Sequence, residues 1–518
     1  MLRKRSLGLL ITAALVGLTA LPASAEGIEL PAIPIPGDVR GTGLEPFRGK
    51  PVTPDPVAAP DVPQHPFMAP NGASNIHDDA YQTDAYKGSG PSGKNLTVRS
   101  RLQAGLCGSL TFDSGGRLVS VCITPGSSPK LVLLNPRTLA TIDTLTLPGT
   151  ASASFTDVSG GGYFYLDNRN RAVVPTKDGG ISVVAIEGDR LVRQRSYDLS
   201  STVGSSGILS ALPDWSGRLW FVTGGGVVGT LDMATGAVAS HALPGERIAN
   251  SLAVDESGGV FIVSDHALYR FDAGHGGEPE ATWRMVYDRG TRQKPGQLSQ
   301  GSGTTPTLIG PASGPGGGYI AIADNADPRM NVIVTARGKA GPTEVCRQPV
   351  FPAGEGADEN SLVAVGGDLI AENNYGYRLD EHPLLKGILG GRQPDTTPGV
   401  ARVHVDYTRR SCSIAWANTT ARVPSVVSKG ALGNGLLYTY THPLASELDH
   451  KPGGGLLGAP DAWYLTALDL RTGKEVWSRL AGTGPLYNNH YATIAIGKDK
   501  AAYSGVVGGL VRIADADD

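Results

Sequence analysis

The stretch "SLAVDESGGVFIVSDHALYRFD", from Ser251 to Asp272, contains the unit that decides the fold. Alternating apolar residues lead to a polar turn with two glycines, a second apolar run follows, and a third begins after another polar link. Period-two alternation bounded by Gly and Asp is typical of antiparallel strands joined by tight turns. The stretch therefore predicts three consecutive strands of one small sheet.

The same unit recurs along the chain, as in "SLTFDSGGRLVSVC" (109–122), "LSALPDWSGRLWFVT" (209–223), "SLVAVGGDLIAENN" (361–374) and "YATIAIGKDKAAYSGVVGGLVRIAD" (491–515). The spacing is about 40–60 residues, as expected of propeller blades. Units begin near Cys107, Ser154, Ile208, Asn250, Thr304, Asn360, Ser425 and Asn489. We therefore predict an all-β protein, a β-propeller of eight blades, with seven as the alternative.

The final unit, from Asn489 onward, is one strand short. An unpaired strand, "NLTVRSRLQ" (Asn95–Gln103), precedes the first unit. We expect this strand to complete the last blade, because closing the ring protects both sheet edges.

The chain before the propeller divides into three segments. Residues 1–25 combine Arg3, Lys4 and Arg5, an apolar run and the small residues Ala23-Ser24-Ala25, which predicts a cleaved signal peptide. An uncleaved membrane anchor is the alternative. Residues 26–74 form a Pro-rich disordered or extended lead-in, residues 75–94 a strap over the propeller face, and residues 95–518 the propeller. We expect a secreted, extracellular or cell-envelope protein with no transmembrane segment after cleavage.

Charge limits the partners. The formal net charge is −3, and removal of the three basic signal residues makes it −6. A mildly acidic chain without a basic run argues against a nucleic-acid partner or an anionic membrane surface. We expect a monomer.

The four cysteines predict two disulfides in an exported protein. If the Ser114-Gly115 pair forms the turn of a hairpin, residues whose numbers add to 229 face each other. Cys107 and Cys122 meet that condition, which leaves Cys346 with Cys412.

A finer motif lies in "YLTALDLRTGKEVWS" (464–478), where Asp469, Thr472 and Gly473 form a turn between strands, and Asp232, Thr235 and Gly236 repeat it. In this pattern, over about 106–518, the chain resembles pyrroloquinoline quinone (PQQ)-like β-propeller repeat proteins. The resemblance implies blades, not bound quinone. The quinone dehydrogenases of this fold commonly carry adjacent cysteines, which this chain lacks, so PQQ is not the expected cofactor.

Polar residues at the starts of inner strands are the candidate ligand-binding residues of the channel: Asn250, Thr304, Asn360, Asn489 and His490. Glu359 and Asp324, with amide oxygens, would suit Ca²⁺. The alternative is that these side chains satisfy backbone groups and hold channel water.

The strap contains "NIHDDAYQTDAY" (75–86), in which His77 and Asp78 are further channel candidates. Otherwise its carboxylates are turn residues and its tyrosines pack on the rim. The preferred hypothesis is a propeller that binds a small molecule or a partner at the channel face, with no catalysis assigned. The alternatives are a Ca²⁺-dependent lactonase- or esterase-like hydrolase, a quinone-dependent oxidoreductase and a cell-surface interaction module.

Overall fold

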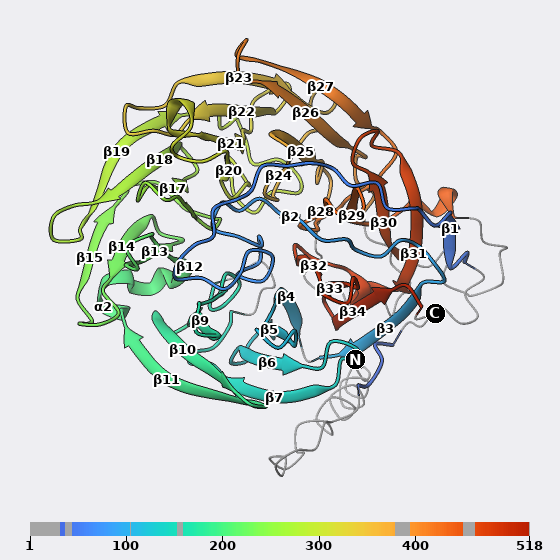
Figure 1. The fold of residues 1–518 in the computed structure, drawn as a ribbon, viewed down its shortest axis with the longest axis horizontal. Helices are drawn as coiled ribbons and strands as arrows, with labels where there is room; N and C mark the ends of the chain where they lie inside the picture. Colours follow the sequence, from blue (N-terminus) through green and yellow to red (C-terminus); the bar gives the residue numbers. More distant parts are fainter. Residues whose placement is uncertain are drawn as a thin grey trace, which may run out of the picture.

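The computed structural model describes residues 32–36, 44–103, 105–152, 159–378, 394–448 and 461–516, so the expected signal peptide lies outside the described residues. Strands in these residues form eight sheets. The sheets are arranged in a ring around a central channel, as Figure 1 shows. The all-β, eight-bladed propeller predicted from the sequence is confirmed.

Four blades follow one another in the first half of the ring, each with its strands in chain order. Their strands are β4 (Leu106–Phe112), β5 (Leu118–Ile123), β6 (Lys130–Leu134) and β7 (Thr141–Thr146); β8 (Tyr165–Leu166), β9 (Arg171–Pro175), β10 (Gly180–Glu187) and β11 (Arg190–Asp198); β12 (Ile208–Pro213), β13 (Leu219–Thr223), β14 (Val227–Leu231) and β15 (Val238–Ala242); β16 (Ala253–Val254), β17 (Val260–Val263), β18 (Ala267–Ala273) and β19 (Pro279–Val286).

The second half holds the other four blades. Their strands are β20 (Thr307–Ile309), β21 (Tyr319–Ala323), β22 (Asn331–Ala336) and β23 (Glu344–Pro349); β24 (Val363–Val365), β25 (Asp368–Glu372), β26 (Val400–Asp406) and β27 (Ser411–Asn418); β28 (Lys429–Ala431), β29 (Leu436–Thr441), β30 (Ala462–Asp469) and β31 (Glu475–Thr483); β32 (Ile494–Ile496), β33 (Ala502–Val506) and β34 (Gly509–Ala514).

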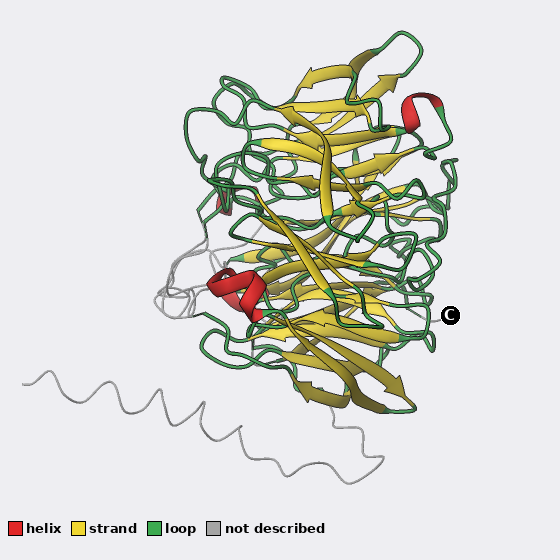
Figure 2. Cartoon of the chain, turned by 90° about the vertical axis from the view of Figure 1, so that its left-hand side faces the viewer, coloured by secondary structure: helices red, strands yellow, loops and turns green. Residues whose placement is uncertain are grey.

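Helical structure is confined to short pieces, and Figure 2 shows that strands and loops make up the body of the ring. The pieces are α2 (Ser200–Val203) and the 3₁₀ turns η1 (Gly204–Ser206), η2 (Pro315–Gly317), η3 (Ala445–Glu447) and η4 (Pro485–Tyr487). No helix in the described ranges has the length and apolar character needed to cross a membrane.

The first turn of several blades is built by an aspartate. In the third blade, Asp214 Oδ1 accepts hydrogen bonds from the backbone N–H groups of Ser216, at 2.9 Å, and Arg218, at 3.1 Å. Gly217 lies between them with a φ of +88°. Since an Asp side chain can bond its own backbone and glycine tolerates positive φ, the Asp–Gly sequence itself fixes this turn.

The Asp–Thr–Gly motif of residues 464–478 is likewise structural. Asp469 Oδ1 accepts from the backbone N–H of Arg471 and of Thr472, at 3.0 and 2.8 Å, and Gly473 has a φ of +69°. Asp232 forms the corresponding turn between β14 and β15. The motif therefore sets strand connections and lies outside the channel.

The ring is closed by the strand that precedes the first blade. β3 (Thr97–Leu102) pairs antiparallel with β34 along its whole length, from Thr97 opposite Ala514 to Leu102 opposite Gly509. The expected closing strand is thus present. The last blade is completed by the chain's N-terminal part, so strands from both ends of the propeller are joined in one sheet.

Both predicted disulfides are present, Cys107–Cys122 and Cys346–Cys412. The predicted hairpin register was wrong by one residue near its turn, because Ser109 faces Val121 there. An irregularity between Leu106 and Ser109 restores the expected register at Leu106 opposite Ile123. The bulge therefore brings the first two cysteines together.

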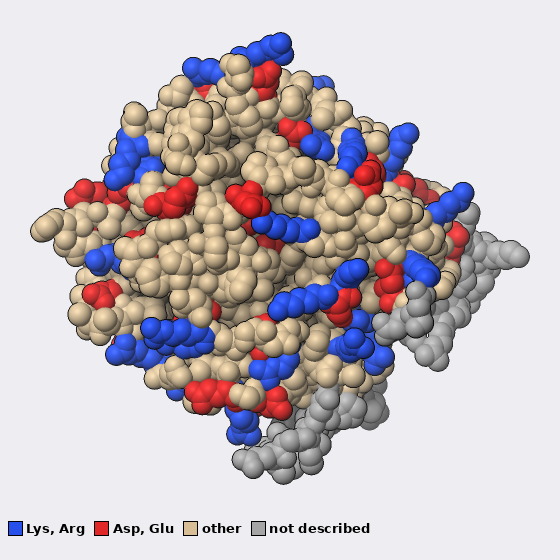
Figure 3. Space-filling model, viewed as in Figure 1, with Lys and Arg blue, Asp and Glu red and all other residues tan. Residues whose placement is uncertain are grey.

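The N-terminal segment runs from the outer edge of the seventh blade into the channel and back (Figure 1). β1 (Phe47–Gly49) extends that blade outside β31, and β2 (Ala85–Tyr86) extends it on the inner side of β28. Figure 3 shows charges of both signs scattered over this face, separated by uncharged residues. The described part of this face presents no continuous basic surface.

The two disulfides should contribute unequally to stability, because they close loops of different length. They join residues 15 and 66 positions apart in the chain. Loop entropy gives about 3 kcal/mol for a loop of the first size and about 4 kcal/mol for the second. In urea denaturation, C346A/C412A should therefore lower the free energy of unfolding more than C107A/C122A. The reverse order would show that local strain, not loop closure, decides their effect.

Candidate functional site

The strap enters the channel and is buried there. All residues from 74 to 84 are buried, and eight of them are polar or charged residues. Their backbone carbonyls accept hydrogen bonds from the inner strands of five blades: Leu166 N–H donates to Ser74, Val254 to Ala80, Leu308 to Tyr81, Ala364 to Thr83 and Gly430 to Asp84. The sequence's polarity suggested a segment outside the core. The structure differs because these polar groups find partners inside the ring.

One ion pair anchors the strap to the seventh blade. The Lys429 ammonium, fully buried on β28, donates to the Asp84 carboxylate and, at 2.5 Å, to the Ile76 carbonyl. Burial raises the pKa of Asp84, but Lys429 and His77 lower it more, so the net shift is downward. Burial lowers the pKa of Lys429, and Asp78 and Asp84 raise it above its usual value. Both partners are therefore charged at neutral pH.

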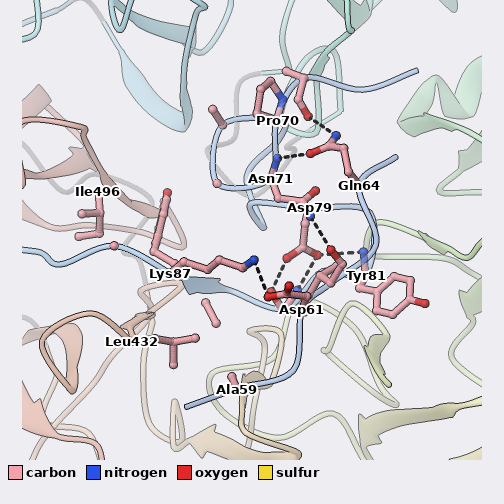
Figure 4. A pocket seen from close by; sticks show the side chains of 18 of the residues that line it. Ala59, Asp61, Gln64, Pro70, Asn71, Asp79, Tyr81, Lys87, Leu432 and Ile496 are labelled. Atoms are coloured by element: carbon pink, nitrogen blue, oxygen red, sulfur yellow. Dashed lines mark hydrogen bonds and ion pairs between the residues drawn. The ribbon is translucent and has the colours of Figure 1, made fainter. Parts of the chain in front are cut away.

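The strap contributes to two separate hollows. The larger is an open basin of about 890 Å³, and Figure 4 shows Asp61 of the lead-in and Lys87 of the strap on its walls. The two side chains form an exposed ion pair of 2.6 Å, and most of the other lining groups are uncharged. The basin therefore offers shape and apolar contact, and its Asp61 and Lys87 charges are already paired with each other.

The smaller hollow is a cavity of about 60 Å³ inside the channel. One water molecule needs about 10–15 Å³, so the cavity has room for a few water molecules or the end of a ligand. Its wall includes these polar residues: His77, Ser109, Tyr163, Asn250, Thr305, Glu359, Asn360, Ser361, His490 and Tyr491.

Glu359 is the least satisfied group of this wall. Its side chain belongs to a residue only 7% exposed, and neither Oε1 nor Oε2 has a hydrogen-bond partner of normal geometry. Burial raises the pKa of Glu359 well above its usual range, the Leu298 backbone amide lowers it, and Asp358 raises it further. Gly303 makes room for it, since a Cβ there would lie 2.4 Å from Oε1.

His77 is held in one orientation. Its Nδ1 lies 3.1 and 3.0 Å from the two oxygens of Asp84 and 2.8 Å from Ser361 Oγ, while Nε2 has no partner. The ring stacks on Tyr163, with centroids 6.1 Å apart. Ser361 and Asp84 both contact the same ring nitrogen, so this is not the relay of a serine hydrolase, in which the serine and the carboxylate bond opposite nitrogens.

Other buried carboxyl groups crowd the same region. Burial raises the pKa of Asp358 to about 8 and that of Asp79 to about 7. Burial raises the pKa of Asp78 to about 8, although Lys429 lowers it. Burial also raises the pKa of Glu372 well above its usual range, and Asp358 and Asp84 raise it further. Lys429 is thus a single buried ammonium among several carboxyl groups.

The structure brings together five of the residues selected from the sequence: His77, Asn250, Glu359, Asn360 and His490 all line the cavity. Thr304 does not, because its hydroxyl bonds Ser302 and the Ala323 amide. Asn489 donates to Ser504 and to the Gly505 carbonyl. Asp78, on the strap, lies 3.5 Å from the ammonium group of Lys429.

Asp324 lies apart from Glu359. Its carboxylate accepts from Asn331 and pairs with Arg347 at 3.1 Å, so it fixes the link between β21 and β22. Among the described residues, no three His, Cys, Asp or Glu side chains are grouped closely enough to hold a metal ion.

The sequence reading missed Lys429, Ser361, Tyr163 and Tyr491. A signal existed for Lys429, which interrupts an otherwise small and apolar inner strand in "SVVSKGAL" (425–432). Asp84 was visible only as a turn residue. Its role depends on contacts with residues some 280 and 345 positions away, which no local pattern records.

No protein-family model matches the chain. A protein of Archaeoglobus fulgidus, itself uncharacterised, is 25% identical over 447 residues, which span 82% of each chain. Among solved structures, Sqt1 of Saccharomyces cerevisiae gives a TM-score of 0.50 at 10% identity, covering 83% of this chain and 100% of its own. BamB of Moraxella catarrhalis gives 0.46 at 10% identity, covering 78% and 94%. At this identity the likeness concerns the fold alone.

The buried carboxyl groups predict a fall in stability between pH 5 and pH 8. Below about pH 4 both states are protonated, whereas from there to pH 8 an unfolded Asp ionises and Asp358 in the folded chain keeps its proton. The folded state then binds more protons, so stability decreases as pH rises, by up to about 1.4 kcal/mol per pH unit for each such group.

Asp358→Asn removes one of these groups, so its free energy of unfolding, measured by denaturant titration at several pH values, should depend less steeply on pH than that of the wild type. Asp61→Asn, at an exposed position, is the control and should leave the slope unchanged. Equal slopes for wild type and Asp358→Asn would contradict the assignment.

Proposed function

We propose that this is an exported β-propeller protein of the PQQ-like repeat type that binds a small molecule in the channel cavity beside the strap. The proposal assigns no catalytic step. The observation that carries it is the carboxyl group of Glu359, which has no hydrogen bond of normal geometry and is buried on the wall of a cavity that four other polar residues predicted from the sequence also line.

A buried polar group without a partner is expensive for a fold. Leaving such a group unsatisfied costs about 1–3 kcal/mol, and more for a charged group. Strap carboxylates such as Asp84 meet this demand with lysine, histidine and serine partners. Glu359 has no such set of partners. This supports a role for its carboxyl group in ligand binding and not in folding.

Export is supported by two features. The disulfides are typical of oxidising compartments, and residues 1–25 have the basic, apolar and small-residue order of a signal peptide. The assignment to PQQ-like repeats is supported by the Asp469 and Asp232 turns, which adopt the same hydrogen-bond pattern in two blades.

The basin favours a second candidate, an interaction module. Its volume of about 890 Å³ lies in the range of about 300–1,000 Å³ that ligand sites occupy. A partner's apolar side chains would suit its largely uncharged walls. The cavity remains the first candidate because, of these two sites, the cavity is the one whose described wall residues include buried polar groups left unpaired.

Glu359→Met should separate a ligand-binding carboxyl group from a structural one. Replacing an unsatisfied buried acid with an apolar side chain should raise the free energy of unfolding by about 1–3 kcal/mol. The same change should abolish the thermal stabilisation that small polar probes give the wild type. The probes are methylammonium, acetamide and glycolate, measured by differential scanning fluorimetry and calorimetric titration.

Two controls place the site. Asp84→Asn should lower stability, because it removes the charge opposite Lys429, and Asp61→Asn should change neither stability nor probe binding. If no probe stabilises the wild type, or if Glu359→Met binds as well as the wild type, the proposal is wrong. If only Asp61→Asn loses binding, the ligand occupies the basin.

A further inference from the structure

The geometry points to a small organic ammonium group as the ligand of the channel cavity. This inference rests on the proposed function, because it names the chemistry recognised at the same site. Three features of the cavity wall carry it: an unpaired carboxyl group, an excess of unpaired acceptors and two tyrosine rings.

Nearly all the unpaired polar atoms of the wall accept hydrogen bonds. Glu359 Oε1 and Oε2, Asn360 Oδ1 and His77 Nε2 lie there without hydrogen-bond partners of normal geometry, and the unpaired wall groups that can also donate are the Ser109 hydroxyl and the Glu359 carboxyl group while it is protonated. The Nδ1 of His77 faces Asp84, so in the tautomer that carries its proton on Nδ1 the Nε2 atom is an acceptor. A ligand that satisfies this wall must therefore bring several donors, as an ammonium group does.

The rings of Tyr163 and Tyr491 border the same space. Both lie near Glu359, because after burial the charge of Glu359 contributes most to raising the pKa of either phenol. The Tyr491 hydroxyl already donates to the Gly296 carbonyl at 2.8 Å, so its ring is what remains for a ligand. Aromatic rings beside a carboxylate attract ligand cations by cation–π and ionic attraction together.

A metal ion fits the wall less well. Ca²⁺ takes six to eight oxygen ligands, commonly from several carboxylates, but within the described ranges no three acidic or histidine side chains gather around one point. Asp324, the second acid expected from the sequence, is paired with Arg347. A single carboxyl group with amides and rings suits an ammonium group, and the cavity of about 60 Å³ admits only a small one.

Binding of a cation here should release a proton. In the empty cavity burial raises the pKa of Glu359 well above its usual range, whereas a bound ammonium group favours the carboxylate and so lowers that pKa. The other titratable groups that face this space are Asp358, His77, His490, Tyr163 and Tyr491. Since Glu359 must ionise, affinity for a cation should rise with pH through the neutral range.

The test is isothermal titration of the full mature chain with methylammonium chloride at pH 6.5 in two buffers of different ionisation enthalpy. We expect binding with release of about one proton for the single ionising carboxyl group. Glu359→Gln, which keeps the shape without the charge, should weaken binding at least about tenfold and release no proton. Tyr491→Leu should weaken binding about threefold to thirtyfold.

The controls separate this inference from the proposed function. Acetamide and sodium chloride should give weaker binding than methylammonium, and calcium chloride should give no proton release. If acetamide binds as tightly as methylammonium, the site takes neutral ligands, and the inference is wrong while the proposed function stands. Proton release with calcium but not with methylammonium would make this a metal site. No binding by any probe would overturn both proposals.

Discussion

A ring of eight blades leaves the inner strand of each blade with backbone groups that face the channel and no neighbouring strand of the same blade to pair with. Buried N–H groups without partners are costly. The strap meets this constraint, because its carbonyls accept from Val254, Leu308, Ala364 and Gly430 in four successive blades. The rest of the site follows from this pairing, which draws a polar segment into the centre of the molecule.

A polar segment can remain in the channel only if its charges are balanced. The carboxylate of Asp84 does this with Lys429, His77 and Ser361, and so joins the strap to the inner strands of two neighbouring blades. One consequence is the fixed orientation of His77. Another is that the strap contributes to a basin through Asp79 and Tyr81 and to a small cavity through Ile76 and His77.

Much of the fold could be predicted from the sequence because propeller blades are local. Asp214, Gly217 and the alternating apolar residues beside them specify a turn and its strands within a few positions. The closing strand was also predictable, since the last unit is one strand short and an unpaired strand precedes the first unit. The hairpin register near Cys107 was not, because a bulge beside a glycine changes the pairing without altering the apolar pattern.

The site was predictable only in part. Polar residues at inner-strand starts, such as Asn250 and His490, reach one cavity because every blade directs that end of its first strand toward the same face. Asp324 has a carboxylate like that of Glu359, but Asp324 forms an ion pair with Arg347. The link between Asp84 and Lys429 spans most of the chain and depends on where the strap lies, which alternation and turn signals do not encode.

Hydrogen exchange of the Lys429→Met variant tests most directly whether the strap is held in the channel by its buried ion pair. Removing one partner of such a pair costs about 3–5 kcal/mol, so the backbone amides of residues 74–86 and of Val254, Leu308 and Ala364 should exchange at least about a hundredfold faster than in the wild type. Lys87→Met, which breaks the exposed pair with Asp61, should leave these rates unchanged. Unaltered protection in Lys429→Met would contradict the account.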